Sequence, residues 1–99
     1  MNTEIIHEAP ARTHPGATVY QIKCTWGEGR KQAYRIVHAQ YERSNASPSK
    51  SLTRAFAGPI GGGMLDDAGP EVVVYGAGPQ LTEAVALACD KWPAKEATK

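Results

Sequence analysis

The sequence predicts an α+β fold, a small and mostly antiparallel sheet of three or four strands with a C-terminal helix packed on one face. Three stretches of the 99-residue chain support this prediction. Residues 18–26 alternate between apolar and polar side chains, residues 72–75 form a short β-branched and aromatic run, and from Leu81 the apolar positions repeat at helical spacing. We expect the last strand and the helix to organise the rest of the fold.

Composition indicates one globular domain, because 41% of the residues are hydrophobic and 21% are charged. We expect a mobile or loosely docked N-terminal arm over 1–16, the domain itself over 17–93, and a polar tail over 94–99. The chain has no run of about 18 apolar residues that would cross a membrane. Its first 16 residues also lack the apolar centre of a signal peptide. These features predict a cytoplasmic protein that does not enter a membrane.

The first regular element is expected to be a hairpin. Residues 18–26 place Tyr20, Ile22 and Cys24 on one face, which predicts a strand with one buried side. Gly27 to Arg30 is a turn, and residues 31–43 are long enough to return as the partner strand. Apolar side chains occur on both faces of that second strand. Either a bulge that switches the buried face or partial cover of both faces would explain the pattern.

Residues 48–57 allow two interpretations. A helix is slightly favoured, with Ser47 as the cap, Pro48 in the first turn and Gly58 at the end. The competing interpretation is a third antiparallel strand with Leu52, Arg54 and Phe56 on one face. Residues 58–70 contain too many glycines and prolines for regular structure, and such loops are often functional.

The C-terminal segment combines a strand and a helix. Residues 72–75, bounded by proline and glycine, predict a central strand covered on both faces. The helix that follows has a core-facing stripe, and proline at position 93 ends it. The stripe consists of Leu81, Val85, Ala88 and Trp92.

No motif for catalysis or cofactor binding occurs together with the neighbouring residues and elements that its function requires. The Gly76–Pro79 turn resembles the start of a dinucleotide fingerprint, but leucine stands at the third glycine position and no parallel strand follows. The glycines of 58–63 lack the lysine of a phosphate loop, and no nucleophile–base arrangement occurs. Asp66 and Asp67 have no further metal ligands at useful spacing. We therefore expect no cofactor, no metal and no enzymatic activity.

The two cysteines, Cys24 and Cys89, lie far apart in the sequence and lack C-x-x-C spacing. We expect two reduced, buried thiols. A disulfide between them would require the first strand and the helix to pack together, with the two α-carbons about 5.5 Å apart.

The charge distribution is the only sequence feature that indicates where a partner binds. The net charge is +1, but residues 23–54 hold seven basic and two acidic residues, whereas residues 55–99 hold three basic and six acidic ones. Such a bipolar molecule is expected to bind a partner through its basic hairpin or through the glycine-rich loop. The candidate partner-binding residues are Lys23, Arg30, Lys31, Arg35, Arg43, Met64, Leu65, Asp66 and Asp67.

The strand, glycine turn and Leu-x-Glu-Ala helix of the C-terminal segment resemble the small sheet-and-helix antitoxin domains of the HicB type, although no DNA-binding segment follows. In format the chain also resembles phage-encoded inhibitors, anti-CRISPR proteins among them. These resemblances imply a non-catalytic protein-binding module that occupies a surface of a larger nucleic-acid-handling complex. The alternative is direct nucleic-acid binding through the basic hairpin, whose cations are interleaved with aromatic residues. A homodimer is compatible with either function.

Overall fold

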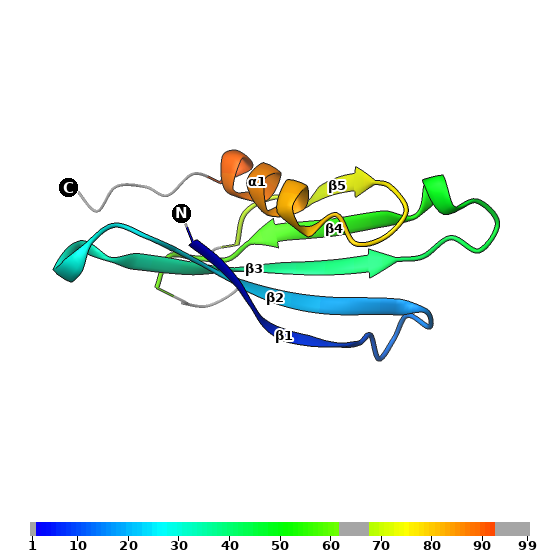
Figure 1. Ribbon diagram of the computed structural model, residues 1–99, viewed down its shortest axis with the longest axis horizontal. Coiled ribbons are helices and arrows are strands. Elements are labelled where there is room, and N and C mark those ends of the chain that lie inside the picture. The colour runs from blue at the N-terminus through cyan, green and yellow to red at the C-terminus, as the bar shows by residue number, and fades with distance from the viewer. Residues whose placement is uncertain (1, 62–67, 93–99) are drawn as a thin grey trace.

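The computed structural model describes residues 2–61 and 68–92, which form five antiparallel strands and one α-helix (Figure 1). The α+β prediction is therefore confirmed, with more strands than expected. The elements are β1 (Asn2–Pro10), β2 (Ala17–Trp26), β3 (Ala33–Glu42), β4 (Leu52–Ala57), β5 (Val72–Tyr75) and α1 (Leu81–Lys91), with single 3₁₀ turns at Gly29–Lys31 and Pro48–Lys50. None of the helices in these residues is long and apolar enough to span a bilayer.

The strands form a meander in the order β1-β2-β3-β4-β5, so each strand pairs with its neighbour in sequence. The helix α1 lies across one face of this sheet and contacts β3, β4 and β5. The core fills the space between them. Its members are Tyr20, Ile22, Cys24, Val37, Ala39, Ala55, Ala57, Val72, Val74, Ala84, Val85 and Ala88.

Most of the predicted helix stripe faces this core. Val85 and Ala88 are buried and Leu81 is partly buried, but Trp92 is 37% exposed beyond the end of α1. The first turn is held by strand side chains. The backbone N–H of Gln80, the residue before α1, donates to Thr53 Oγ1 at 3.0 Å, while the helix has no side-chain cap of its own.

Within the N-terminal arm expected over 1–16, residues 2–10 form the edge strand β1, which pairs with β2. A register shift between Ile5 and His7 turns successive parts of β1 toward opposite faces of the sheet. Ile5 lies opposite Ile22 on the helix side, whereas His7 lies opposite Gln21 on the other side. This shift and the exposure of β1 explain why the sequence showed no sustained period there.

The β2–β3 hairpin is present, and β3 has one buried face and one half-buried face. Its register with β2 is continuous from Ala33 to Glu42, so the alternative with a bulge is wrong for this strand. Val37 is buried on the side of the sheet that α1 covers. Ile36 and His38 are half-buried on the opposite side.

The favoured helix over residues 48–57 is wrong, because residues 52–57 form β4. Thr53, Ala55 and Ala57 are buried while the residues between them are half-buried, a period of two that belongs to a strand. Pairing with both β3 and β5 satisfies the β4 backbone. Local capping signals at Ser47 and Pro48 produce only one 3₁₀ turn.

The prediction of a central strand at residues 72–75 is also wrong. β5 is the last strand of the sheet, and Val73 and Tyr75 are 38% and 67% exposed. A four-residue apolar run therefore indicated the strand correctly but not its position. Because valine occupies three successive positions, the sequence does not show which of these residues face the core.

Candidate functional site

The face of the sheet opposite α1, which we call the open face, is the candidate site. Cross-strand pairing arranges its side chains in rows, because residues directly opposite one another point to the same side. One row crosses four strands, from β1 to β4, and consists of His7, Gln21, His38 and Phe56. The next row crosses from β2 to β5 and consists of Val19, Gln40, Arg54 and Val73.

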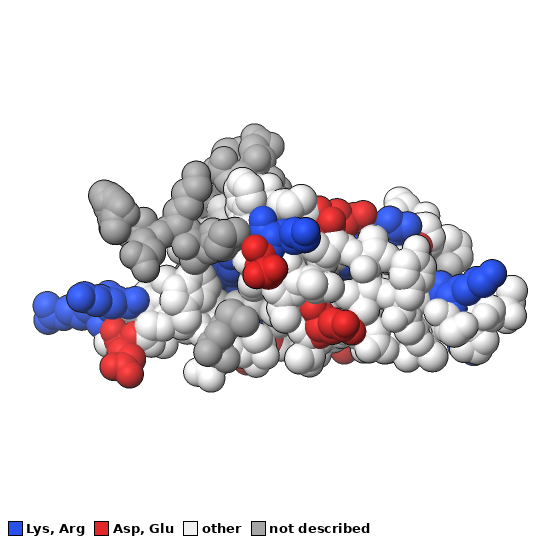
Figure 2. All heavy atoms as spheres, turned by 90° about the horizontal axis from the view of Figure 1, so that it is seen from above, with Lys and Arg blue, Asp and Glu red and all other residues white. Residues whose placement is uncertain are grey.

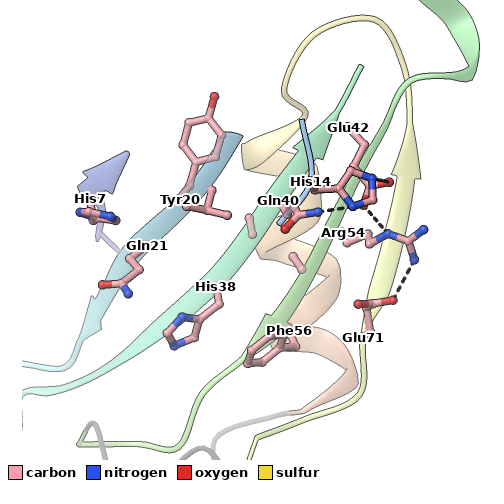
Figure 3. A pocket seen from close by; sticks show the side chains of 13 residues that line it. His7, His14, Tyr20, Gln21, His38, Gln40, Glu42, Arg54, Phe56 and Glu71 are labelled. Carbon is pink, nitrogen blue, oxygen red and sulfur yellow. Dashed lines mark hydrogen bonds and ion pairs between the residues drawn. The ribbon is translucent and has the colours of Figure 1, made fainter. Parts of the chain in front are cut away.

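These rows border a shallow hollow of about 600 Å³ (Figure 3). Among its lining residues, the rings of His38 and Phe56 stack with centroids 5.1 Å apart and planes inclined by 17°. Burial lowers the pKa of His38, so its imidazole is neutral near pH 7 and offers one donor and one acceptor. The stacked pair therefore provides a flat apolar surface with a hydrogen-bonding edge.

One side of the hollow carries an ionic network (Figure 3). Arg54 Nε donates to Glu42 at 2.7 Å, and Arg54 Nη1 donates to Glu71 at 3.2 Å. Gln40 donates to the same Glu42 carboxylate at 3.1 Å, and His14 lies 3.5 Å from it. The hydrogen bond that Arg54 donates to Glu42 is the main reason that the pKa of Arg54 is raised. The charge of Arg54 is thus matched within the protein.

Toward the β2–β3 turn the open face becomes basic. Lys23 Nζ lies 4.9 Å from the centroid of the Tyr34 ring, a cation–π contact between neighbouring strands. The Tyr34 hydroxyl donates to the Gly61 carbonyl at 2.9 Å, which fixes the ring. Arg30 and Lys31 follow in the exposed 3₁₀ turn at the tip of the hairpin.

The structure separates the predicted partner-binding residues. Lys23, Arg30 and Lys31 share the hairpin end, but Arg43 is exposed at the opposite end of β3. Figure 2 shows Lys and Arg side chains at both ends of the molecule, and both basic and acidic side chains between them. Met64, Leu65, Asp66 and Asp67 lie outside the described residues.

Arg35 does not belong to the basic surface, and its assignment there is wrong. It is only 2% exposed, on the helix side of β3. Its Nε donates to the Gly58 carbonyl at 3.1 Å and its Nη1 to the Trp92 carbonyl at 2.6 Å. The available signal was its position, which shares a face with Val37 and Ala39 in the alternation of β3.

The open face was the main feature that the sequence did not reveal as a site. Its histidines, amides and aromatic residues come from segments that showed no common motif, and only the register of four strands brings them together. Within residues 2–61 and 68–92, no group of three or more histidine, cysteine or acidic side chains is placed to hold a metal ion. Protein-family models, curated proteins and solved structures were all compared with this chain, and none matches.

Proposed function

We propose that the protein is a non-catalytic module that binds a protein partner through the open face. The observation that carries this proposal is the division of the sheet into two unlike faces. One face is covered by α1 and holds the core, whereas the other is hollowed, partly apolar and uncovered by any described segment. A sheet face of this kind offers area and shape for docking without further rearrangement.

The charge of the open face favours a protein over a nucleic acid. Near its centre Arg54 is matched by Glu42 and Glu71, and the His38 imidazole is neutral near pH 7. The exposed cations Arg30 and Lys31 lie at one end of β3 and Arg43 at the other, and β3 is a ten-residue strand about 33 Å long. That separation exceeds the Debye length of about 8 Å at physiological salt. A nucleic-acid track would need a continuous line of cations for its phosphates.

The partner surface that fits has two parts. An apolar or aromatic side chain would enter the hollow and pack on Phe56, with Gln21 and Gln40 as hydrogen-bonding groups beside it. An acidic rim would lie against Lys23 and the hairpin tip, where complementary charge accelerates association. The resemblances found in the sequence make the proposal more specific: the protein would be an inhibitor that covers part of a larger nucleic-acid-handling complex. The two free thiols agree with the cytoplasmic location that this role requires.

Site-specific photo-crosslinking tests the proposal directly, because the experiment itself captures the partner. A benzophenone side chain at position 40, on the open face, should crosslink one partner protein in a cell lysate. The same side chain at position 87, exposed on α1, is the matched control and should not. Crosslinking to the same protein from both positions, or from position 87 alone, would contradict the proposed surface.

The identified partner then permits a quantitative comparison. Phe56→Ala should weaken the purified complex by about tenfold or more, as truncation of a central aromatic contact usually does. Lys23→Glu should slow association more at low salt than at high salt. Lys91→Glu makes the same charge change on α1 and should leave both the dissociation constant and the association rate constant unchanged. Equal effects from Lys23→Glu and Lys91→Glu would show that only net charge matters.

A single-stranded nucleic acid is the second candidate, favoured by the contact between Lys23 and Tyr34 beside the basic hairpin tip. This function predicts direct binding of oligonucleotides that weakens steeply between about 50 and 200 mM salt. Replacement of Arg30 and Lys31 with glutamine should reduce the log–log salt slope by about one for each phosphate contact removed. Salt-independent or undetectable binding would eliminate this candidate.

A further inference from the structure

Two thiols and a guanidinium form a cluster on the helix side of the sheet, away from the open face. Cys24 comes from β2, Arg35 from β3 and Cys89 from α1. Cys24 is fully buried and Cys89 is partly buried, and both are free thiols. Their side chains are close enough for a hydrogen bond between them. Cys24 lies directly opposite Arg35 in the register of β2 and β3, and Cys89 packs against the core cluster that contains Cys24.

Arg35 is fixed in place beside these thiols. The carbonyls of Gly58 and Trp92 accept hydrogen bonds from its guanidinium, and its charge lies close enough to Cys89 to favour the thiolate. An Arg side chain stays charged in proteins. A permanent positive charge therefore faces the partly buried thiol, at a position that two backbone contacts determine.

The two thiols consequently differ in acidity. The hydrogen bond from Cys24, assisted by the charge and hydrogen bond of Arg35, lowers the pKa of Cys89 to about 6. The pKa of Cys24 is raised, first by its hydrogen bond to Cys89 and then by burial. Near pH 7 the cluster thus contains a Cys89 thiolate and a protonated Cys24, the arrangement that thiol–disulfide exchange needs.

We propose that Cys89 is a thiol–disulfide exchange site for low-molecular-weight disulfides such as oxidised glutathione, with Cys24 as the resolving cysteine. The evidence for this site is the contact between the two sulfurs, the fixed guanidinium beside them, and the partial exposure of Cys89 alone. It is independent of the open face and of the proposed protein partner.

The exchange takes two steps. The Cys89 thiolate attacks one sulfur of glutathione disulfide, which forms a mixed disulfide and releases one glutathione thiolate. Cys24 then gives its proton to a released thiolate and attacks the Cys89 sulfur, which expels the second glutathione. Counted from the Cys89 thiolate and the Cys24 thiol, the protein loses two electrons and one proton as the Cys24–Cys89 disulfide forms. One glutathione disulfide becomes one glutathione thiol and one glutathione thiolate, which takes its proton from solvent. The product joins α1 covalently to β2.

Intact-protein mass spectrometry after incubation with glutathione disulfide tests this sequence of steps. Wild type should become lighter by two hydrogen atoms, without accumulation of an adduct. Cys24→Ser keeps a hydroxyl donor to Cys89 but cannot resolve the first intermediate, so it should gain one glutathionyl group on Cys89. Cys89→Ser should remain unmodified while folded, because Cys24 is buried. A stable glutathionyl adduct on wild type would overturn the role of Cys24.

The rate of iodoacetamide alkylation of Cys24→Ser provides a second readout. A thiol with a pKa of about 6 should react about twofold faster at pH 8.5 than at pH 6, because it is already half ionised at the lower pH. An ordinary cysteine, with a pKa of about 8.5, should react about 160-fold faster. Circular dichroism at both pH values verifies that the variant is folded. A ratio near the second value, or a folded variant that alkylates only after denaturation, would overturn the proposal.

Discussion

Replacement of the buried Arg35 by methionine should destabilise the fold strongly. Methionine keeps most of the aliphatic stem, so the change removes the guanidinium rather than the packing volume. The Gly58 and Trp92 carbonyls then lose donors at 3.1 and 2.6 Å. Hydrogen bonds that involve a charged group contribute about 1.5–3 kcal/mol each, which gives a loss of about 3–6 kcal/mol. A domain of this size is stable by only about 5–15 kcal/mol.

Thermal unfolding followed by circular dichroism measures this loss. A destabilisation of about 3 kcal/mol corresponds to a fall in Tm of at least about 12 °C for a domain near 100 residues. Arg35→Lys is the matched control, because it keeps the charge but cannot donate from two directions to both carbonyls. We expect it to unfold between wild type and the methionine variant. If Arg35→Met melts within about 2 °C of wild type, the cost of burying the guanidinium equals its hydrogen bonds, and the reasoning is refuted.

Three further predictions concern the core, the thiols and the glycine turn. Val85→Asp should remove most of the stability, because Val85 is 4% exposed, whereas Leu87→Asp, at a position 37% exposed, should cost less than about 1 kcal/mol in urea unfolding. The pKa of Cys89 is lower in the folded state than in the unfolded state. Its contribution to the free energy of unfolding is therefore complete above about pH 8.5 and is lost as pH falls through about 6. Between pH 6 and 8, urea unfolding should therefore show a steeper rise in stability for wild type than for Cys89→Ser. Millimolar adenine or nicotinamide nucleotides should give no thermal shift, because the Gly76–Pro79 turn lacks the context of a dinucleotide site, and a reproducible stabilisation would contradict this.

The sequence predicted those parts of the fold in which one face is clearly buried. The alternation around Tyr20 and Ile22 located β2, and the spacing of Val85 and Ala88 located the inner side of α1. Errors occurred where local signals competed with pairing. Ser47 and Pro48 favour the start of a helix, but β3 and β5 supply backbone partners on both sides of residues 52–57, and tertiary pairing decides their structure.

The candidate site was harder to predict, for a physical reason. His7, Gln21, His38 and Phe56 belong to four strands, and no spacing in the sequence expresses a row that depends on three registers. The bulge in β1 is decisive, because without it His7 would lie on the other face. By contrast, the half-buried place of Lys23 on the open face follows from one alternating strand, and the exposure of Arg30 and Lys31 follows from one turn, so both could be predicted locally.

The relative lengths of the elements distinguish residues that fold the protein from residues available for binding. The eleven residues of α1 span about 16 Å, about half the length of the ten-residue strands β2 and β3. The helix contacts β3, β4 and β5, and the tip of the β2–β3 hairpin contributes no residue to the core. Charge changes at Arg30 and Lys31 should therefore alter stability by less than about 0.5 kcal/mol. Because folding does not require these two charges, a change in binding after their replacement can be attributed to contact with a partner.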